Sequence, residues 1–178
     1  MKSVIVEGID CSGKSSLIKA LKYKLKKYGG YDVKELEHKD ISNQFSRYAL
    51  EYLSVSHTLF DRSHISEIVF GSILRNTIPF SSFQIKILNE IVSSEFVTVL
   101  ATPSYDDFIS RYQETRKYQV ISVTDFNKIN DKFIESCAYV NSIVYRSSSF
   151  NELEEVSNDI VNLLTNGELN NDRISANP

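Results

Sequence analysis

The sequence predicts a three-layer α/β/α domain, in which helices cover both faces of a central five-stranded parallel sheet. Short runs rich in β-branched residues alternate along the chain with longer amphipathic segments, which is the order of right-handed β-α-β units. The length of 178 residues and the apolar content of 42% fit one domain with a continuous core. We assign that domain to residues 1–165 and expect a mobile tail at 166–178, where the sequence is polar and has no periodicity.

The first half of the chain is expected to hold three pairs of a strand and a helix. The first strand is a β-branched run, and the helix after it places Leu17, Leu21, Leu25 and Tyr28 on one face. Two glycines then end that helix. The elements expected up to residue 74 are strands at 3–7, 31–37 and 57–61 and helices at 13–28, 42–53 and 63–74.

The second half continues the alternation. Pro79 interrupts the chain before the next helix, and Pro103 stops the fourth strand. The elements expected here are strands at 96–100 and 141–145 and helices at 81–93, 105–111, 125–139 and 151–164. Ligands of such sheets bind beyond the carboxyl ends of the strands. The chemistry is therefore expected just after the ends of the first four strands, at Glu7, Glu37, Asp61 and Leu100.

A phosphate-binding loop lies between the first strand and the first helix. The segment Gly8-Ile9-Asp10-Cys11-Ser12-Gly13-Lys14-Ser15 matches the pattern G-x-x-x-x-G-K-[ST] in full. Backbone N–H groups of such a loop surround phosphate oxygens, while the lysine reaches the β- and γ-phosphates and the serine hydroxyl binds Mg²⁺. We therefore expect a P-loop NTPase fold that uses ATP and Mg²⁺. The expected ATP-binding residues are Gly8, Asp10, Cys11, Ser12, Gly13, Lys14, Ser15 and Ser16.

Asp61 is the second candidate for the chemistry, because it ends the apolar third strand. P-loop enzymes keep at such a position the acid that holds the metal ion. With Ser15, Asp61 would form the metal site. The alternative is a purely structural role, since Asp61 and Ser63 both suit the N-cap of the following helix.

These motifs resemble those of thymidylate kinases. The segment Glu7-Gly8-Ile9-Asp10 resembles the start of that family's phosphate loop, and Asp61-Arg62 resembles its Asp-Arg pair after the third strand. Thr102-Pro103 with Arg111 and Arg116 is similar to its strand–proline–helix–lid segment. The resemblance in layout extends over about residues 1–165 and is specific at the phosphate loop and at Asp61-Arg62.

The resemblance implies a Mg-ATP-dependent kinase acting on a deoxynucleoside monophosphate, such as dTMP or a related pyrimidine nucleotide. Asp10 would contact the acceptor sugar and Arg62 its 5′-phosphate, while Lys14 with Arg111 or Arg116 would stabilise the transferring phosphoryl group. The family also suggests a homodimer.

The base pocket is less defined by the sequence. Phe45, or Tyr48 nearby, could stack on the nucleobase, with Arg47 near the acceptor phosphate. Aromatic residues at helical spacing also serve simply as core, and that alternative stays open.

Two departures from the family leave the acceptor open. Cys11 stands where some thymidylate kinases carry an arginine, and Glu37-His38-Lys39-Asp40 replaces the family's Arg-Glu-Pro-Gly type of turn. The nearest alternative is a deoxynucleoside kinase, whose (Glu/Asp)-Arg-Ser motif resembles Asp61-Arg62-Ser63. Such an enzyme needs a general base near the 5′-hydroxyl, and Glu37, or less well Glu35, stands at the expected place. An alternative of another class is a P-loop module that binds nucleotide and turns over slowly.

Composition limits the partners that we expect. The net charge of −3 provides no general attraction to nucleic acid, and we interpret the lysines of the first helix as a solvated face. No apolar run is long enough to cross a bilayer. Cys11 and Cys137 lie far apart and suggest no disulfide framework. The prediction is a cytoplasmic protein with reduced thiols that binds small nucleotides, not nucleic acid or membranes.

Overall fold

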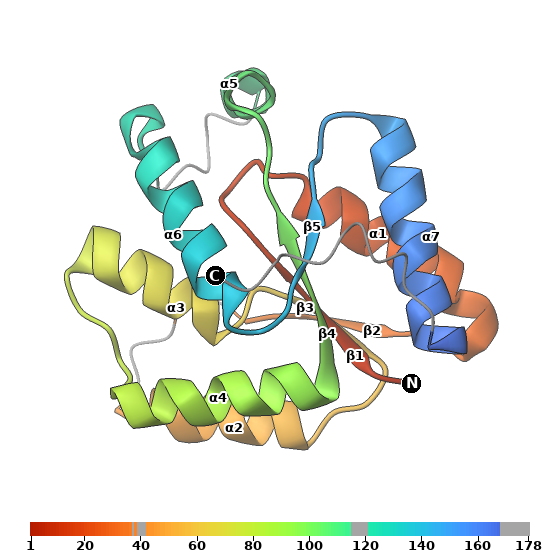
Figure 1. Cartoon of the computed structure of the whole chain (residues 1–178), viewed down its shortest axis with the longest axis horizontal. Helices are drawn as coiled ribbons and strands as arrows, with labels where there is room; N and C mark the ends of the chain where they lie inside the picture. The colour runs from red at the N-terminus through yellow and green to blue at the C-terminus, as the bar shows by residue number, and fades with distance from the viewer. Residues whose placement is uncertain (37, 39–41, 115–120, 168–178) are drawn as a thin grey trace.

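The computed structural model describes residues 1–36, 38, 42–114 and 121–167. A parallel sheet of five strands in the order β2-β3-β1-β4-β5 runs through the molecule (Figure 1). The strands are β1 (Ser3–Glu7), β2 (Asp32–Glu35), β3 (Thr58–Asp61), β4 (Phe96–Ala101) and β5 (Ile143–Tyr145). Helices pack on both faces, so the predicted three-layer α/β/α architecture is confirmed.

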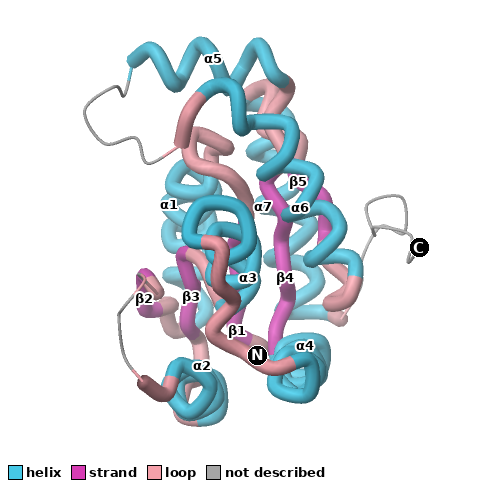
Figure 2. Tube along the Cα trace, turned by 90° about the vertical axis from the view of Figure 1, so that its left-hand side faces the viewer, coloured by secondary structure: helices cyan, strands magenta, loops and turns pink. Residues whose placement is uncertain are grey.

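The helices divide between the two faces of the sheet. The seven α-helices in the described part of the chain are α1 (Lys14–Leu25), α2 (Gln44–Leu53), α3 (His64–Phe70), α4 (Ser82–Glu95), α5 (Tyr105–Glu114), α6 (Phe126–Ala138) and α7 (Phe150–Asn166). Helices α1 and α7 pack together on one face, and α3, α4 and α6 contribute to the core on the other. Figure 2 shows α5 beyond the upper end of β4, where the strand's carboxyl end lies.

The central strand β1 is buried on both sides. Ile5 faces the core cluster shared with α3 and α6, whereas Val4 and Val6 face the cluster shared with α1 and α7. Such two-sided burial explains the continuous apolar run in the sequence. It also places the end of β1, and hence the phosphate-binding loop, in the middle of the sheet.

Two details differ from the sequence prediction. Tyr28 is 39% exposed, unlike the fully buried Leu17, Leu21 and Leu25, because α1 ends at Leu25 and a 3₁₀ turn, Lys26–Tyr28, changes the helical period. The helix expected at 63–74 ends as α3 at Phe70 and continues as a π turn, Gly71–Arg75, followed by Asn76 in the left-handed conformation.

The last helix ends two residues beyond its expected end at residue 164. Helix α7 extends to Asn166, and Gly167 follows in a left-handed conformation (φ 74°) that suits a helix C-cap. The tail predicted at 166–178 lies, from residue 168 onward, outside the described residues. Among the described helices, none combines the length and apolar character needed to cross a membrane.

Candidate functional site

The phosphate-binding loop curls tightly between β1 and α1. Gly8 and Gly13 have φ angles of 138° and 87°, and Cys11 also lies in the left-handed region at 61°. A Cβ atom at Gly8 would lie 2.4 Å from the carbonyl oxygen of Ala101, so only glycine allows the loop to pack this closely on β4. No side chain caps the start of α1, and its first turn contains no acidic residue. The helix N-terminus therefore offers its N–H groups to an anion.

Lys14 lies inside this loop. Its side chain is buried, and Nζ donates to the carbonyl oxygens of Gly8 (3.1 Å) and Ile9 (2.8 Å). Burial and the neighbouring Arg62 lower the pKa of Lys14 to about 8, although Asp61 and other nearby carboxylates act in the opposite direction. The lysine thus occupies the position in the loop that the motif predicts.

Asp61 ends β3 directly beside β1, in register with Val6. Its Oδ1 is buried and has no hydrogen-bond partner among the described residues. The N-cap of α3 is Ser63, whose side chain accepts from the amide of Ile65, so Asp61 is not needed for capping. A buried carboxylate oxygen of this kind can serve as a metal ligand.

Ser15 and Asp61 provide the kind and number of ligands that a magnesium ion takes from a protein, and too few for a metal site made of protein ligands alone. Ser15 lies exposed in the first turn of α1. Within the described ranges, no group of three His, Cys, Asp or Glu residues could hold a metal. Mg²⁺ commonly takes only one or two protein carboxylates and completes its shell with phosphate oxygens and water. The hydroxyl of Ser15 and the carboxylate of Asp61 match that donor set.

Arg62 follows Asp61 and reaches back to the loop. Its guanidinium forms an ion pair with Asp10 and donates to the Gly8 carbonyl (3.4 Å) and to Ser66 Oγ (3.3 Å). The Arg62 backbone is left-handed (φ 75°), an uncommon conformation for a residue other than glycine. Asp10 and Arg62, the two residues expected on the acceptor side, are thus brought into contact.

Arg111 approaches the loop from the other side. From α5 it donates to the carbonyl of Cys11 (3.2 Å) and to the hydroxyl and carbonyl oxygens of Ser147, after β5. A cavity of about 290 Å³ adjoins it, lined in part by Gly13 and Ser16. Arg116, the other predicted lid arginine, lies outside the described residues.

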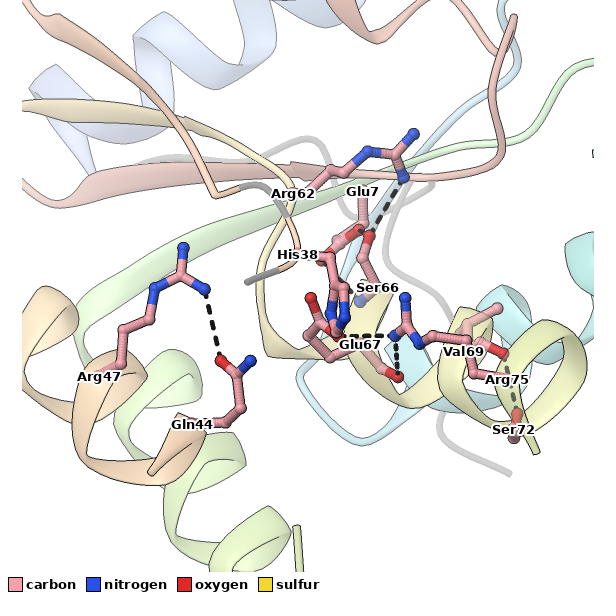
Figure 3. Close-up of polar contacts among 10 residues, drawn as sticks. All are labelled: Glu7, His38, Gln44, Arg47, Arg62, Ser66, Glu67, Val69, Ser72 and Arg75. Atoms are coloured by element: carbon pink, nitrogen blue, oxygen red, sulfur yellow. Dashed lines mark hydrogen bonds and ion pairs between the residues drawn. The ribbon is translucent and has the colours of Figure 1, made fainter. Parts of the chain in front are cut away.

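A second polar cluster lies between α2 and α3 (Figure 3). Glu67 is buried on α3, and its Oε2 accepts from Arg75 (2.6 Å) and lies 2.8 Å from Nδ1 of His38. On α2, Arg47 donates to Gln44 over 3.4 Å. Neither Glu67 nor Arg75 was predicted from the sequence. The available signal was an acid in the otherwise apolar segment that starts α3, where a buried charge needs a partner.

The aromatic candidates on α2 differ in exposure. Tyr48 is fully buried among Tyr52, His64 and Phe80, so its ring belongs to the core and is not available to a nucleobase. Phe45 is half-buried against the same core. Its role in stacking stays a prediction.

Comparisons with known proteins identify the fold. No family model and no curated protein matches the chain. Among solved structures, the YorR protein of Bacillus subtilis in complex with phosphorylated GDP aligns with a TM-score of 0.74 and 16% identity, over 91% of this chain and 95% of its own. The chain has the fold of P-loop kinases.

Other solved structures with this P-loop kinase fold align less closely. A deoxyadenosine kinase from M. mycoides with bound dATP aligns with a TM-score of 0.61 and 13% identity, over 90% of this chain and all of its own. Shikimate kinase from Acinetobacter baumannii in complex with shikimate aligns at 0.55 and 9%, over 96% of both chains. At such identities the likeness establishes the fold alone.

In this P-loop kinase fold, three cationic side chains converge on one loop. Lys14 and Arg62 donate to the carbonyl of Gly8, and Arg111 donates to that of Cys11. Cations and backbone N–H groups around one anion site can stabilise charge that spreads over phosphoryl oxygens.

Proposed function

We propose that this protein is a Mg-ATP-dependent kinase that transfers the γ-phosphoryl group to a deoxynucleoside monophosphate. The acceptor we propose is dTMP or a related pyrimidine nucleotide, and the product is the diphosphate. The observation that carries the proposal is the arrangement of Lys14, Arg62 and Arg111 around the phosphate-binding loop, with Asp10 paired to Arg62. Lys14 and Arg111 serve the donor phosphates, and the Asp10–Arg62 pair serves the acceptor.

Each residue has a proposed role in this reaction. Lys14, with Arg111 or Arg116 as the lid arginine, would stabilise charge on the transferring group. Arg62 would exchange Asp10 for the acceptor's phosphate, while Asp10 turns to the sugar. Ser15 and Asp61 would hold Mg²⁺, which neutralises charge on the phosphates when bound. A monophosphate acceptor is already ionised, so no strong base is required.

A deoxynucleoside kinase is the second candidate, and the register of β2 favours it. Glu35 pairs with Asp61 across the two strands, and the amide of Leu36 donates to the Asp61 carbonyl. Glu37, the proposed base, is the next residue in the sequence and lies outside the described residues. A structure of the M. mycoides deoxyadenosine kinase with the products dCMP and dCDP is also similar, with a TM-score of 0.53. Guanosine nucleotides belong among the candidates too, because YorR was solved with phosphorylated GDP.

Release of ADP from Mg·ATP, measured against a panel of nucleosides and nucleoside monophosphates, tests both candidates. Turnover with dTMP, dUMP or another pyrimidine monophosphate supports the proposal, and Lys14→Ala should abolish it while the protein stays folded. Arg62→Ala should raise the acceptor KM about tenfold or more, because a hydrogen bond to a charged group contributes roughly 1.5–3 kcal/mol.

The other outcomes discriminate between the alternatives. Turnover with nucleosides alone would replace the proposal by the deoxynucleoside kinase, and Glu37→Gln should then abolish it. Binding of ATP without transfer to any member of the panel would indicate a nucleotide-binding module.

A further inference from the structure

A buried carboxylate lies at the end of β1, directly before the phosphate-binding loop. Glu7 is the last residue of β1 and is fully buried. Its Oε1 accepts from the Ser63 hydroxyl and, at 3.4 Å, from the Ser66 amide, and its Oε2 accepts from the Ser66 hydroxyl at 2.7 Å. Burial raises the pKa of the Glu7 carboxyl, whereas these hydrogen bonds and the charges of Arg62 and Lys14 oppose that effect.

Each serine hydroxyl that Glu7 holds has a second partner. A hydroxyl carries one proton, and an ionised carboxylate can only accept, so both serines give their proton to Glu7. Ser63 Oγ is then left to accept from the amide of Ile65 (3.1 Å), which caps α3. Ser66 Oγ is left to accept from Arg62 Nη1 (3.3 Å; Figure 3). Glu7 therefore sets the direction of every hydrogen bond in this network.

Arg62 is also tied to β1 through its backbone. Its amide donates to the carbonyl of Val6 (3.1 Å), the residue before Glu7. The same side chain carries the ion pair with Asp10 in the loop that follows Glu7. Arg62 is therefore held at two points. Its main chain is bonded to β1, and its guanidinium is bonded to Ser66, which in turn is bonded to Glu7.

We propose that Glu7 is a positioning residue, which orients the Arg62 guanidinium for the acceptor's phosphate through the hydroxyl of Ser66. The inference depends on the proposed function, because it assumes that Arg62 binds the acceptor. Glu7 is fully buried and therefore offers no exposed surface to a substrate. Its effect should fall mainly on acceptor binding. Well below pH 8, where Lys14 stays protonated with or without the Glu7 charge, ATP binding and kcat should be nearly unchanged.

Glu7→Gln is the informative change, since it keeps the size and removes the charge. A carboxamide has an NH₂ group, which cannot accept from a hydroxyl or an amide. If that group faces Ser66, it donates to Ser66 Oγ and competes with Arg62 for the lone pairs of that hydroxyl, while the serine proton must turn elsewhere. We expect the acceptor Kd to rise about fivefold, which corresponds to the roughly 1 kcal/mol of one net hydrogen bond.

A double-mutant cycle tests whether the effect passes through Arg62. The acceptor Kd is measured by titration calorimetry for wild type, Glu7→Gln, Arg62→Ala and the double variant, with the monophosphate found by turnover as the probe. Glu7→Gln should weaken binding in the wild-type background and have little effect when Arg62 is alanine. Ser66→Ala is the matched variant: it should weaken binding to a similar extent and should not add to Glu7→Gln.

Each result of the cycle decides one question. The same loss from Glu7→Gln in both backgrounds means that Glu7 acts on the fold in general, and overturns the inference. Loss of ATP affinity equal to the loss of acceptor affinity does the same. If Arg62→Ala leaves the acceptor Kd unchanged, the proposed function fails at its acceptor site. If Glu7→Gln does not fold, Ser66→Ala in the two Arg62 backgrounds provides the same comparison, and additivity there overturns the inference.

Discussion

At the scale of single residues, the phosphate-binding loop lowers the pKa of Lys14. Its ammonium is buried against two backbone carbonyls and next to the guanidinium of Arg62, and its pKa is lowered to about 8. A desolvated cation interacts strongly with an anion that replaces its lost hydration. An anion bound in the loop should therefore favour the protonated form of Lys14.

ATP affinity should consequently depend on pH in the alkaline range. As the pH rises through about 8, the unliganded protein loses the Lys14 proton, and binding of the phosphates must take it up again. The ATP Kd should rise by up to about tenfold for each pH unit from about pH 8 to about pH 9.5. Calorimetric titration measures this. Lys14→Met, the control, should bind weakly with no such slope, and a flat wild-type profile would refute the prediction.

At the scale of elements, one buried histidine joins three helices. His64 begins α3, and its Nδ1 lies 2.9 Å from the hydroxyl of Tyr52 on α2, while its Nε2 lies 2.9 Å from Oδ1 of Asn89 on α4. The Tyr52 oxygen also accepts from the His64 amide (3.0 Å). Tyr52 thus donates to Nδ1, and Nε2–H donates to Asn89, which is the pattern of a neutral imidazole.

This histidine should make the protein sensitive to acid. Burial lowers the pKa of His64 from 6.5 to about 4. Between these values the unfolded chain binds a proton that the folded protein does not, so the free energy of unfolding falls as the pH falls from 6.5 to 4. The expected loss is about 3 kcal/mol, at roughly 1.4 kcal/mol for each pKa unit. Below pH 4, His64 should contribute no further loss.

Urea unfolding of wild type and His64→Gln, measured at several pH values, separates this contribution from that of the carboxylates. The stability of the variant should fall less between pH 6.5 and pH 4 than that of wild type. The exposed His57→Gln is the matched control. Equal pH dependence in wild type and His64→Gln would show that His64 does not cause the acid sensitivity.

At the scale of the whole molecule, two apolar cores share a single sheet. One core packs between the sheet and α1 with α7, and includes Leu21, while the other includes Phe133 on α6. The central strand β1 contributes to both. Loss of either core removes the support of β1, so the two layers should unfold together.

Leu21→Ala and Phe133→Ala test this coupling. They should lower the free energy of unfolding by about 2–5 and about 3–5 kcal/mol, because each leaves a cavity in a close-packed core. Both variants should still unfold in one transition, with far-ultraviolet circular dichroism and tyrosine fluorescence coinciding. Tyr23→Ala, at an 82% exposed position on α1, should change stability by less than about 0.5 kcal/mol. Two separate transitions would mean that the cores are independent.

The architecture and the phosphate-binding loop of this protein could be predicted from the sequence. Strand and helix periods are local properties, and the glycines and Lys14 act through the backbone next to them. For the same reason the element boundaries agree to within a few residues. Helical period alone could not detect the turns that displace Tyr28 from the buried face of α1 and end α3 at Phe70.

Contacts between residues far apart in the sequence could be seen only in the tertiary structure. The strand order sets β3 beside β1, and thereby brings Ser66 to Glu7 and Arg62 to Asp10. Packing of α3 buries Glu67 against Arg75 and His38, and the path of α5 brings Arg111 to Cys11, 100 residues away. Such contacts leave no period or spacing in the sequence, because they depend on the order in which strands join a sheet and on how helices pack over it.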